Sequence, residues 1–417
     1  MSLRGRLARM AGSSAPDPAR DALLDDLRTR MRRVLERTAR PQEPPPPLAI
    51  DDPDGALPFF SEETERGVLH RRVLRIGVTH RTGRAHARAA KDVDCTLLSL
   101  LALDPALASV DFARALYLDT ETTGLSGGTG TVAFLVGLAT WDEAGLFVEQ
   151  LLVRNLGEEA PMLAHVRARV EASSALVTYN GKSFDMPLLR TRFAMARIAA
   201  PPDRPHLDLL HVARRVHGRK SRLTALEERV LGYVREDDVP SGEVSGRYLH
   251  FLRTGNESAL RGVVEHNAQD VISMAALVGL YGEPVESTSL AAADLVGVAK
   301  AMKSAKALDR AFATATLAHG RGAGPEALRA RAAIARARGD RDRALADLEA
   351  LLAELDCDAA RLELAKLYEH HVKDAGHALE LVARGVAEDE AGVEKRKARL
   401  ARKIERQRQA RLFRSSG

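Results

Sequence analysis

The chain is poor in the residues that mark several common protein classes. Cys95 and Cys357 are its only cysteines, and they lie far apart without metal-ligand spacing, which argues against a disulfide scaffold and a thiolate zinc site. Aromatic residues make up only 4% of the chain. No apolar run reaches the length of a membrane span, and the arginine-bearing N-terminus lacks the apolar core of a signal peptide. We therefore expect a cytoplasmic protein with no membrane partner.

The rest of the composition is typical of an ordinary soluble protein that is rich in helix. Of the 417 residues, 45% are hydrophobic and 29% are charged, and the formal net charge is +5. A chain of this length can form two or three domains. A mildly basic charge permits a polyanionic partner without requiring one.

Five segments follow one another along the chain. We expect a basic N-terminal segment with a proline-rich linker at 1–57, an entry segment at 58–112, an α/β domain at 113–286, a helical region at 287–390 and a basic tail at 391–417. The first segment contains a helical pattern at 21–35 and prolines at 41–47, which predict a stiff, extended linker.

The α/β domain begins with three apolar runs in close order. Residues 115–119, 132–140 and 146–153 are joined by short links, which is typical of antiparallel hairpins. A helical stretch at 158–171 then leads to a fourth strand at 175–179, and further helices end at 260–281. This order resembles an RNase H-like core, a mixed sheet flanked by helices, although other α/β folds begin similarly.

The helical region contains two patterns of helical hairpins. They cover 327–345 and 360–381, and Leu345 and Leu379 are 34 residues apart, which is the period of tetratricopeptide repeats. Plain packing of a helical bundle is an equal alternative. The basic tail is predicted to be helical, and we favour a solvated or disordered segment over contact with nucleic acid.

A pair of carboxylates closes the first strand of the α/β domain. Asp119 and Glu121 follow an apolar run and are two residues apart, so their side chains share one face of the strand. Two like charges side by side are unfavourable unless a cation lies between them. A solvated edge strand is the alternative interpretation.

Two further segments carry carboxylates. Asp185 starts a predicted helix after the turn at Asn180 and Gly181, where an ordinary helix cap is the alternative. His266 and Asp270 are four residues apart and share one face of an otherwise apolar helix, where a surface pair is the alternative. Together the acids fit phosphodiester cleavage by two divalent ions, for which carboxylate oxygens are the preferred ligands.

Three ordered motifs give the chain its resemblance to a known family. Residues 118–130 (LDTETTGLSGGTG), 180–189 (NGKSFDMPLL) and 265–270 (EHNAQD) resemble the motifs of the DEDD 3′–5′ exonuclease superfamily and, within it, of the YprB-like ribonuclease H-like domain proteins. The segments 206–211 and 222–227 are also similar. Proteins of that family are often followed by tetratricopeptide-type helices, as the C-terminal hairpins here would be.

The resemblance implies a metal-dependent nuclease that uses two Mg²⁺ or Mn²⁺ ions. Asp119 would bridge both ions, Glu121 and Asp270 would complete one site, and Asp185 would serve the other through water. His266 would position or deprotonate the attacking water. One departure concerns this residue, because relatives with a catalytic His place it five residues before the last Asp, and the spacing here is the four of relatives with Tyr.

The expected activity is 3′–5′ exonucleolytic cleavage of single-stranded DNA or RNA. The alternatives are a structure-selective endonuclease and a non-catalytic nucleic-acid-binding scaffold whose C-terminal helices bind a protein. Asp208 is expected to support a metal ligand or to cap a helix. The candidate substrate-binding residues are Thr122, Asn180, Lys182 and Arg190. The candidate phosphate contacts are Arg190, Arg192, Arg214, Arg215, Arg219 and Lys220, for which a solvated basic surface is an equal alternative.

Overall fold

The computed structural model describes residues 55–124, 129–219 and 221–415. By its internal contacts the chain divides into two units, residues 1–49 and residues 50–417. The predicted N-terminal helix at 21–35 and the proline-rich linker lie outside the described residues.

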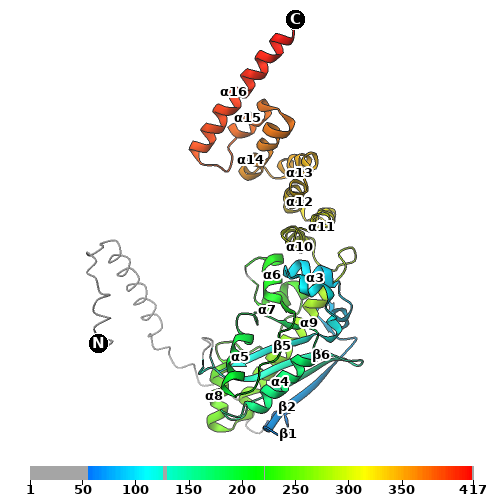
Figure 1. Ribbon diagram of the computed structural model, residues 1–417, viewed down its shortest axis with the longest axis vertical. Coiled ribbons are helices and arrows are strands. Elements are labelled where there is room, and N and C mark those ends of the chain that lie inside the picture. Colours follow the sequence, from blue (N-terminus) through cyan, green and yellow to red (C-terminus); the bar gives the residue numbers. More distant parts are fainter. Residues whose placement is uncertain (1–54, 125–128, 220, 416–417) are drawn as a thin grey trace, which may run out of the picture. The chain divides into compact units, whose positions relative to one another are not determined.

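A seven-stranded mixed sheet in the order β1-β2-β7-β6-β5-β8-β9 forms the centre of the α/β domain (Figure 1). The strands from β1 to β5 in this order pair antiparallel, whereas β8 and β9 run parallel to β5. The strands are β1 (Phe60–Thr64), β2 (Gly67–Gly77), β5 (Leu116–Thr122), β6 (Ala133–Trp141), β7 (Gly145–Leu152), β8 (Leu176–Thr178) and β9 (His206–Asp208), and β3 (Arg81–Thr82) pairs with β4 (Ala85–His86) in a small second sheet. The three predicted antiparallel strands and the fourth strand are thus confirmed, and the entry segment adds the edge strand β1 and its neighbour β2.

Helices cover both faces of this sheet. They are α3 (Cys95–Ala102), α4 (Ala160–Ala172), α5 (Asp185–Met195), α6 (Leu209–His217), α7 (Leu223–Leu226), α8 (Val244–Thr254) and α9 (Arg261–Tyr281), with the short turns η1 (Ala87–Lys91), η2 (Pro105–Ser109), η3 (Phe112–Arg114), η4 (Glu227–Leu231) and η5 (Glu257–Leu260). None of the helices in the described ranges is long and apolar enough to cross a membrane.

The alternation of side chains along β5 assigns its two faces to different helices. Leu116 and Leu118 lie in one buried cluster with residues of α4 and α5. Tyr117 lies in another cluster with residues of α3, α6 and the second half of α9. Because successive residues of a strand point to opposite faces, Asp119 and Glu121 share the α9 face with Tyr117, and Thr120 shares the α5 face with Leu118.

The C-terminal region is helical, as expected. Its elements are α10 (Ala292–Ser304), α11 (Leu308–Gly320), α12 (Gly324–Arg338), α13 (Arg341–Glu354), α14 (Asp358–Leu367), η6 (Tyr368–Val372), α15 (Ala375–Ala383) and α16 (Glu390–Ser415). Consecutive helices pack against each other, and α10 also contacts α6 of the α/β domain. Assignment to tetratricopeptide repeats stays a prediction.

The basic C-terminal segment forms the helix α16 and is docked over its first half. Leu400 is fully buried against the apolar cluster of α12 to α15. The buried carboxylate of Glu369 accepts hydrogen bonds of 2.8 Å from Arg399 and from Lys403. Two cations of the tail are therefore paired with a buried carboxylate of the helical region.

Candidate functional site

The end of β5 divides its polar residues between two helices. Asp119 accepts a 2.9 Å hydrogen bond at Oδ2 from Nδ2 of Asn267 on α9. Thr120, on the opposite face, donates its hydroxyl to Oδ1 of Asp185 at 2.5 Å. The strand end thus reaches the first residue of α5 and the middle of α9 at once, which brings the three predicted motifs together.

Asp185 is not a helix cap, so that alternative interpretation is wrong. It is the first residue of α5, the N-cap position is occupied by Phe184, and the buried side chain of Asp185 accepts from Thr120. The preceding loop is held by Asp208, whose two carboxylate oxygens accept the backbone N–H groups of Asn180 and Lys182. Asp208 also caps α6 by accepting from the Leu210 N–H. Both roles of Asp208 are structural, and it lies beside the motif loop.

His266 faces two of the carboxylates. Its Nε2 atom lies 3.9 Å from Oε1 of Glu121 and 3.7 Å from Oδ2 of Asp270. The side chains of all three residues are between 12% and 15% exposed, so the cluster is sheltered but open to solvent. The spacing of four residues therefore places the imidazole directly at the acids.

Burial and neighbouring carboxylates raise the pKa values of Asp119 and Glu121. Burial, then the carboxylates of Asp270, Glu121 and Asp185, raise the pKa of Asp119 well above its ordinary value, against the Asn267 hydrogen bond that lowers it. Burial, then Asp270 and Asp185, raise the pKa of Glu121 well above its ordinary value. Burial raises the pKa of Asp185 to about 6. Such a donor set, made only of mutually repelling carboxylate oxygens, fits a divalent cation.

A hydrogen-bond relay that the sequence did not reveal orients Asp119. Arg72 on β2 donates to Oε1 of Gln150 on β7 at 2.9 Å, and Nε2 of Gln150 donates to Oδ1 of Asn267 at 2.9 Å. Asn267 then donates to Asp119. Gly137 of β6 lies between Asp119 and Gln150 in the sheet, and a Cβ atom there would be 2.5 Å from Oδ1 of Asn267. Only glycine leaves room for the amide that holds Asp119.

Arg235 supplies the internal positive charge of the cluster and was also missed. Its guanidinium donates to both oxygens of Glu227 at 2.7 and 2.6 Å, and its Nη2 also donates to Oδ1 of Asp270. The side chains of Arg235 and Glu227 are only 7% and 1% exposed. Glu227 ends the segment 222–227, which the sequence singled out without giving it a role.

Three of the four acids share one pattern. Asn267 holds one oxygen of Asp119, Thr120 holds one of Asp185, and Arg235 holds one of Asp270. Anchoring one oxygen fixes the orientation of a carboxylate and leaves the other for a ligand. Over the part of the chain that the structure describes, no group of three or more His, Cys, Asp or Glu side chains is already arranged to hold a metal ion.

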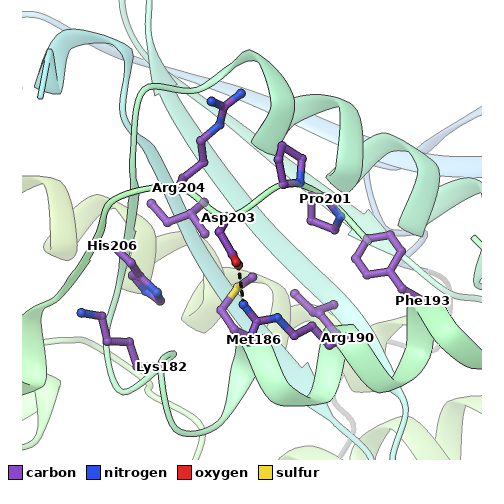
Figure 2. Close-up of a pocket in the computed structure, with 11 residues that line it drawn as sticks. Lys182, Met186, Arg190, Phe193, Pro201, Asp203, Arg204 and His206 are labelled. Atoms are coloured by element: carbon purple, nitrogen blue, oxygen red, sulfur yellow. Dashed lines mark hydrogen bonds and ion pairs between the residues drawn. The ribbon is translucent and has the colours of Figure 1, made fainter. Parts of the chain in front are cut away.

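The predicted substrate-binding residues do not gather at the acids. Lys182 and Arg190 line a cavity of about 290 Å³ on another face of α5, where Figure 2 shows the Arg190–Asp203 ion pair beside Met186. Burial, then the positive charge of Lys182, lowers the pKa of His206, which lines the same cavity, to about 4. The only aromatic side chain in the lining is Phe193, which is 1% exposed and cannot stack on a base.

Most of the other candidate substrate-binding and phosphate-binding residues bond to groups of the protein itself or lie on its surface. Arg192 forms a buried ion pair with Glu159, and Arg215 donates to the carbonyl of Leu101. Thr122 is buried and donates to the Gly124 carbonyl. Asn180 is exposed at a turn with φ of 69°, Arg214 and Arg219 are exposed, and Lys220 lies outside the described residues.

Comparison with known proteins identifies the family of this chain. The family model described as the RNase_H superfamily matches residues 116–281. The chain is also 31% identical over 318 residues, 69% of its length and 73% of the other protein, to "Uncharacterized protein YprB" of Bacillus subtilis (strain 168). The chain therefore belongs to the same family as YprB, and residues 116–281 form its RNase H-like domain.

A solved structure is similar over part of the chain. The family B DNA polymerase from the hyperthermophilic archaeon Pyrobaculum calidifontis aligns with a TM-score of 0.33 at 13% identity. The alignment covers 45% of this chain and 29% of the polymerase. The chain thus matches less than two thirds of that protein.

Proposed function

We propose that the protein is a metal-dependent 3′–5′ exonuclease that hydrolyses single-stranded DNA or RNA. The observation that carries this proposal is the meeting of four carboxylates from β5, α5 and α9 beside the imidazole of His266. The RNase H-like domain at 116–281 supports a nuclease, and a nuclease implies nucleic-acid binding. Exonucleolytic cleavage and 3′–5′ polarity rest on the motif resemblance.

The cofactors in this proposal are two Mg²⁺ or Mn²⁺ ions. Asp119, Glu121 and Asp270 would hold one ion, and Asp119 and Asp185 the other. When bound, such ions polarise the phosphate and lower the pKa of a coordinated water. The raised pKa values of Asp119 and Glu121 support this assignment, because a divalent cation would offset the repulsion that raises them.

The acids, His266 and Arg235 would have different roles in the reaction. The carboxylates that are anchored at one oxygen would present the other oxygen to a divalent cation, without reorganisation during the reaction. His266 Nε2 would accept a proton from the attacking water or hold that water in line, since it lies beside Glu121 and Asp270. Arg235 would keep its hydrogen bond to Asp270 during the reaction, because two further hydrogen bonds to Glu227 fix its guanidinium.

The test uses the full chain with end-labelled single strands of DNA and RNA and either metal. We expect stepwise shortening from the 3′ end and release of 5′-mononucleotides, and Asp119→Asn should abolish both. Asp203→Asn is the matched control, because it also removes one carboxylate of the domain but one that is exposed and paired with Arg190. A wild-type protein that degrades neither nucleic acid with either metal would contradict the proposal.

A specific observation favours one other candidate, a nucleic-acid-binding protein without catalysis. Arg235 already neutralises Asp270, and no three of the acids in the described ranges are arranged around a metal position. This candidate predicts metal-independent binding of single strands without shortening. Cleavage of a circular single strand would instead indicate a structure-selective endonuclease.

We also propose a cytoplasmic location and a protein partner for the C-terminal helices. A cavity of about 250 Å³ between α12, α13 and α14, lined mainly by apolar and arginine side chains, supports a peptide-binding role. Deletion of residues 324–417 should abolish capture of such a partner and leave cleavage of a short single strand unchanged.

A further inference from the structure

We propose that Asp238 is a positioning residue that orients His266 so that its Nε2 atom faces the carboxylates. The Oδ1 atom of Asp238 lies 2.5 Å from Nδ1 of His266. Asp238 belongs to none of the three sequence motifs, and it enters the site from the irregular segment between η4 and α8. The consequence for catalysis rests on the proposed function, whereas the orientation of the ring does not.

Hydrogen-bond chemistry determines which nitrogen of His266 carries the proton. An ionised carboxylate offers only acceptors, so a bond between Asp238 and Nδ1 requires a proton on Nδ1. Arg235 Nη1 lies 3.1 Å from the same atom and would need a lone pair on Nδ1 to donate to it, so the two contacts compete. The shorter contact, with Asp238 at 2.5 Å, assigns the proton to Nδ1. The favourable partner of Arg235 here is Asp238 itself, at 3.6 Å. In the neutral ring, Nε2 therefore presents its lone pair toward Glu121 and Asp270.

Two contacts hold Asp238 at the ring. On one side, Arg235 is tied by both of its bonds to the buried carboxylate of Glu227. On the other side, Val239 is 4% exposed and packs against Gly262 of α9, where a Cβ atom would be only 2.5 Å from Cγ2 of Val239. Gly262 is four residues before His266 and shares its helix face. The segment therefore cannot slide along α9 without losing one of these contacts.

The ring of His266 needs such a partner. The χ2 torsion of histidine has two broad, nearly equivalent orientations, so the helix alone does not choose which ring nitrogen points at the acids. Asp238 removes this freedom by binding Nδ1. With Asp238 bound to Nδ1, His266 directs Nε2 toward the carboxylates although it lies four, and not five, residues before Asp270.

The decisive experiment measures the ring directly by ¹⁵N NMR of the metal-free full-length protein with labelled histidine, using His266→Gln to assign the signals. We expect His266 in the Nδ1–H tautomer in the wild type. Asp238→Ala should give a mixture of tautomers. Asp237→Asn, which removes the neighbouring exposed carboxylate, should leave the wild-type spectrum unchanged. An Nε2–H tautomer in the wild type, or an unchanged tautomer in Asp238→Ala, would overturn the proposal.

Kinetics then separate this inference from the proposed function. Asp238→Ala should lower kcat about 10- to 100-fold and change KM for the single strand by no more than about twofold. The reason is that the variant loses the group that orients the His266 ring, and Asp238 itself does not contact the substrate. Asp238→Asn, which retains an acceptor oxygen, should recover part of kcat. If the wild type is inactive but shows the Nδ1–H tautomer, the proposed function fails and the orientation stands. If it is active and Asp238→Ala has normal kcat, the positioning role fails alone.

Discussion

Replacing Gly137 with alanine tests how Asp119 is held. The new Cβ atom would lie 2.5 Å from Oδ1 and 2.9 Å from Cγ and Nδ2 of Asn267. Asn267 is 0% exposed and bonded to both Gln150 and Asp119, so it has no free space into which to move. Either this amide or the whole of α9 must shift, and the bond to Asp119 weakens in both cases.

The expected cost combines two effects. Overpacking a buried site costs about 1–3 kcal/mol, and a weakened buried hydrogen bond adds about 1–3 kcal/mol. We therefore expect urea unfolding to show a loss of about 2–6 kcal/mol in the free energy of unfolding. Nuclease activity should fall about 10- to 100-fold, as is typical when the partner of a metal-binding carboxylate is lost.

Two comparisons make this test strict. Gly77→Ala in β2 of the same sheet adds a methyl group with no atom within 4 Å and should change the free energy of unfolding by less than about 0.5 kcal/mol. In an Asn267→Ala background the clash is absent, so Gly137→Ala should cost less than about 1 kcal/mol there. An equal cost of Gly137→Ala in both backgrounds would refute the reasoning.

Three further predictions concern charged groups. Burial raises the pKa of Asp185 to about 6, so the folded metal-free protein binds that proton more tightly than the unfolded chain, and its stability falls as pH rises between 3.8 and about 6. Asp185→Asn should make this fall shallower in thermal unfolding measured across that pH range. A pH profile identical to that of the wild type would contradict the prediction. Arg235→Gln removes the counter-charge of Glu227, whose side chain is only 1% exposed. The free energy of unfolding in urea should fall by about 3–5 kcal/mol. A loss below about 1 kcal/mol would show that the ion pair is solvated. Glu369→Gln should release α16 from its anchor and speed tryptic cleavage there several-fold, whereas Glu405→Gln should not.

The sequence predicted the parts of the site that depend on local pattern. The alternation of β5 placed Asp119 and Glu121 on one face, and the four-residue spacing placed His266 and Asp270 on one face of α9, as the structure shows. The order of strands also indicated the mixed sheet.

What the sequence could not predict depends on contacts between distant segments. Gln150 and Asn267 are 117 residues apart, and their bond depends on how α9 crosses β7. Arg235 and Asp238 lie in a segment without helix or strand, so no periodicity pointed to them. Arg192 was a candidate phosphate contact, yet Glu159, 33 residues away, holds it in a buried ion pair.

The central claim is that the acid cluster binds divalent metal for phosphodiester cleavage. The most direct measurement counts bound Mn²⁺ by electron paramagnetic resonance on the full-length protein, in the presence of a single strand with a cleavage-resistant phosphorothioate linkage at its 3′ end. We predict two Mn²⁺ ions per wild-type chain and a loss of both in Asp119→Asn, with Asp203→Asn unchanged. A wild-type chain that binds no Mn²⁺, or an Asp119→Asn variant that binds as many ions as the wild type, would contradict the account.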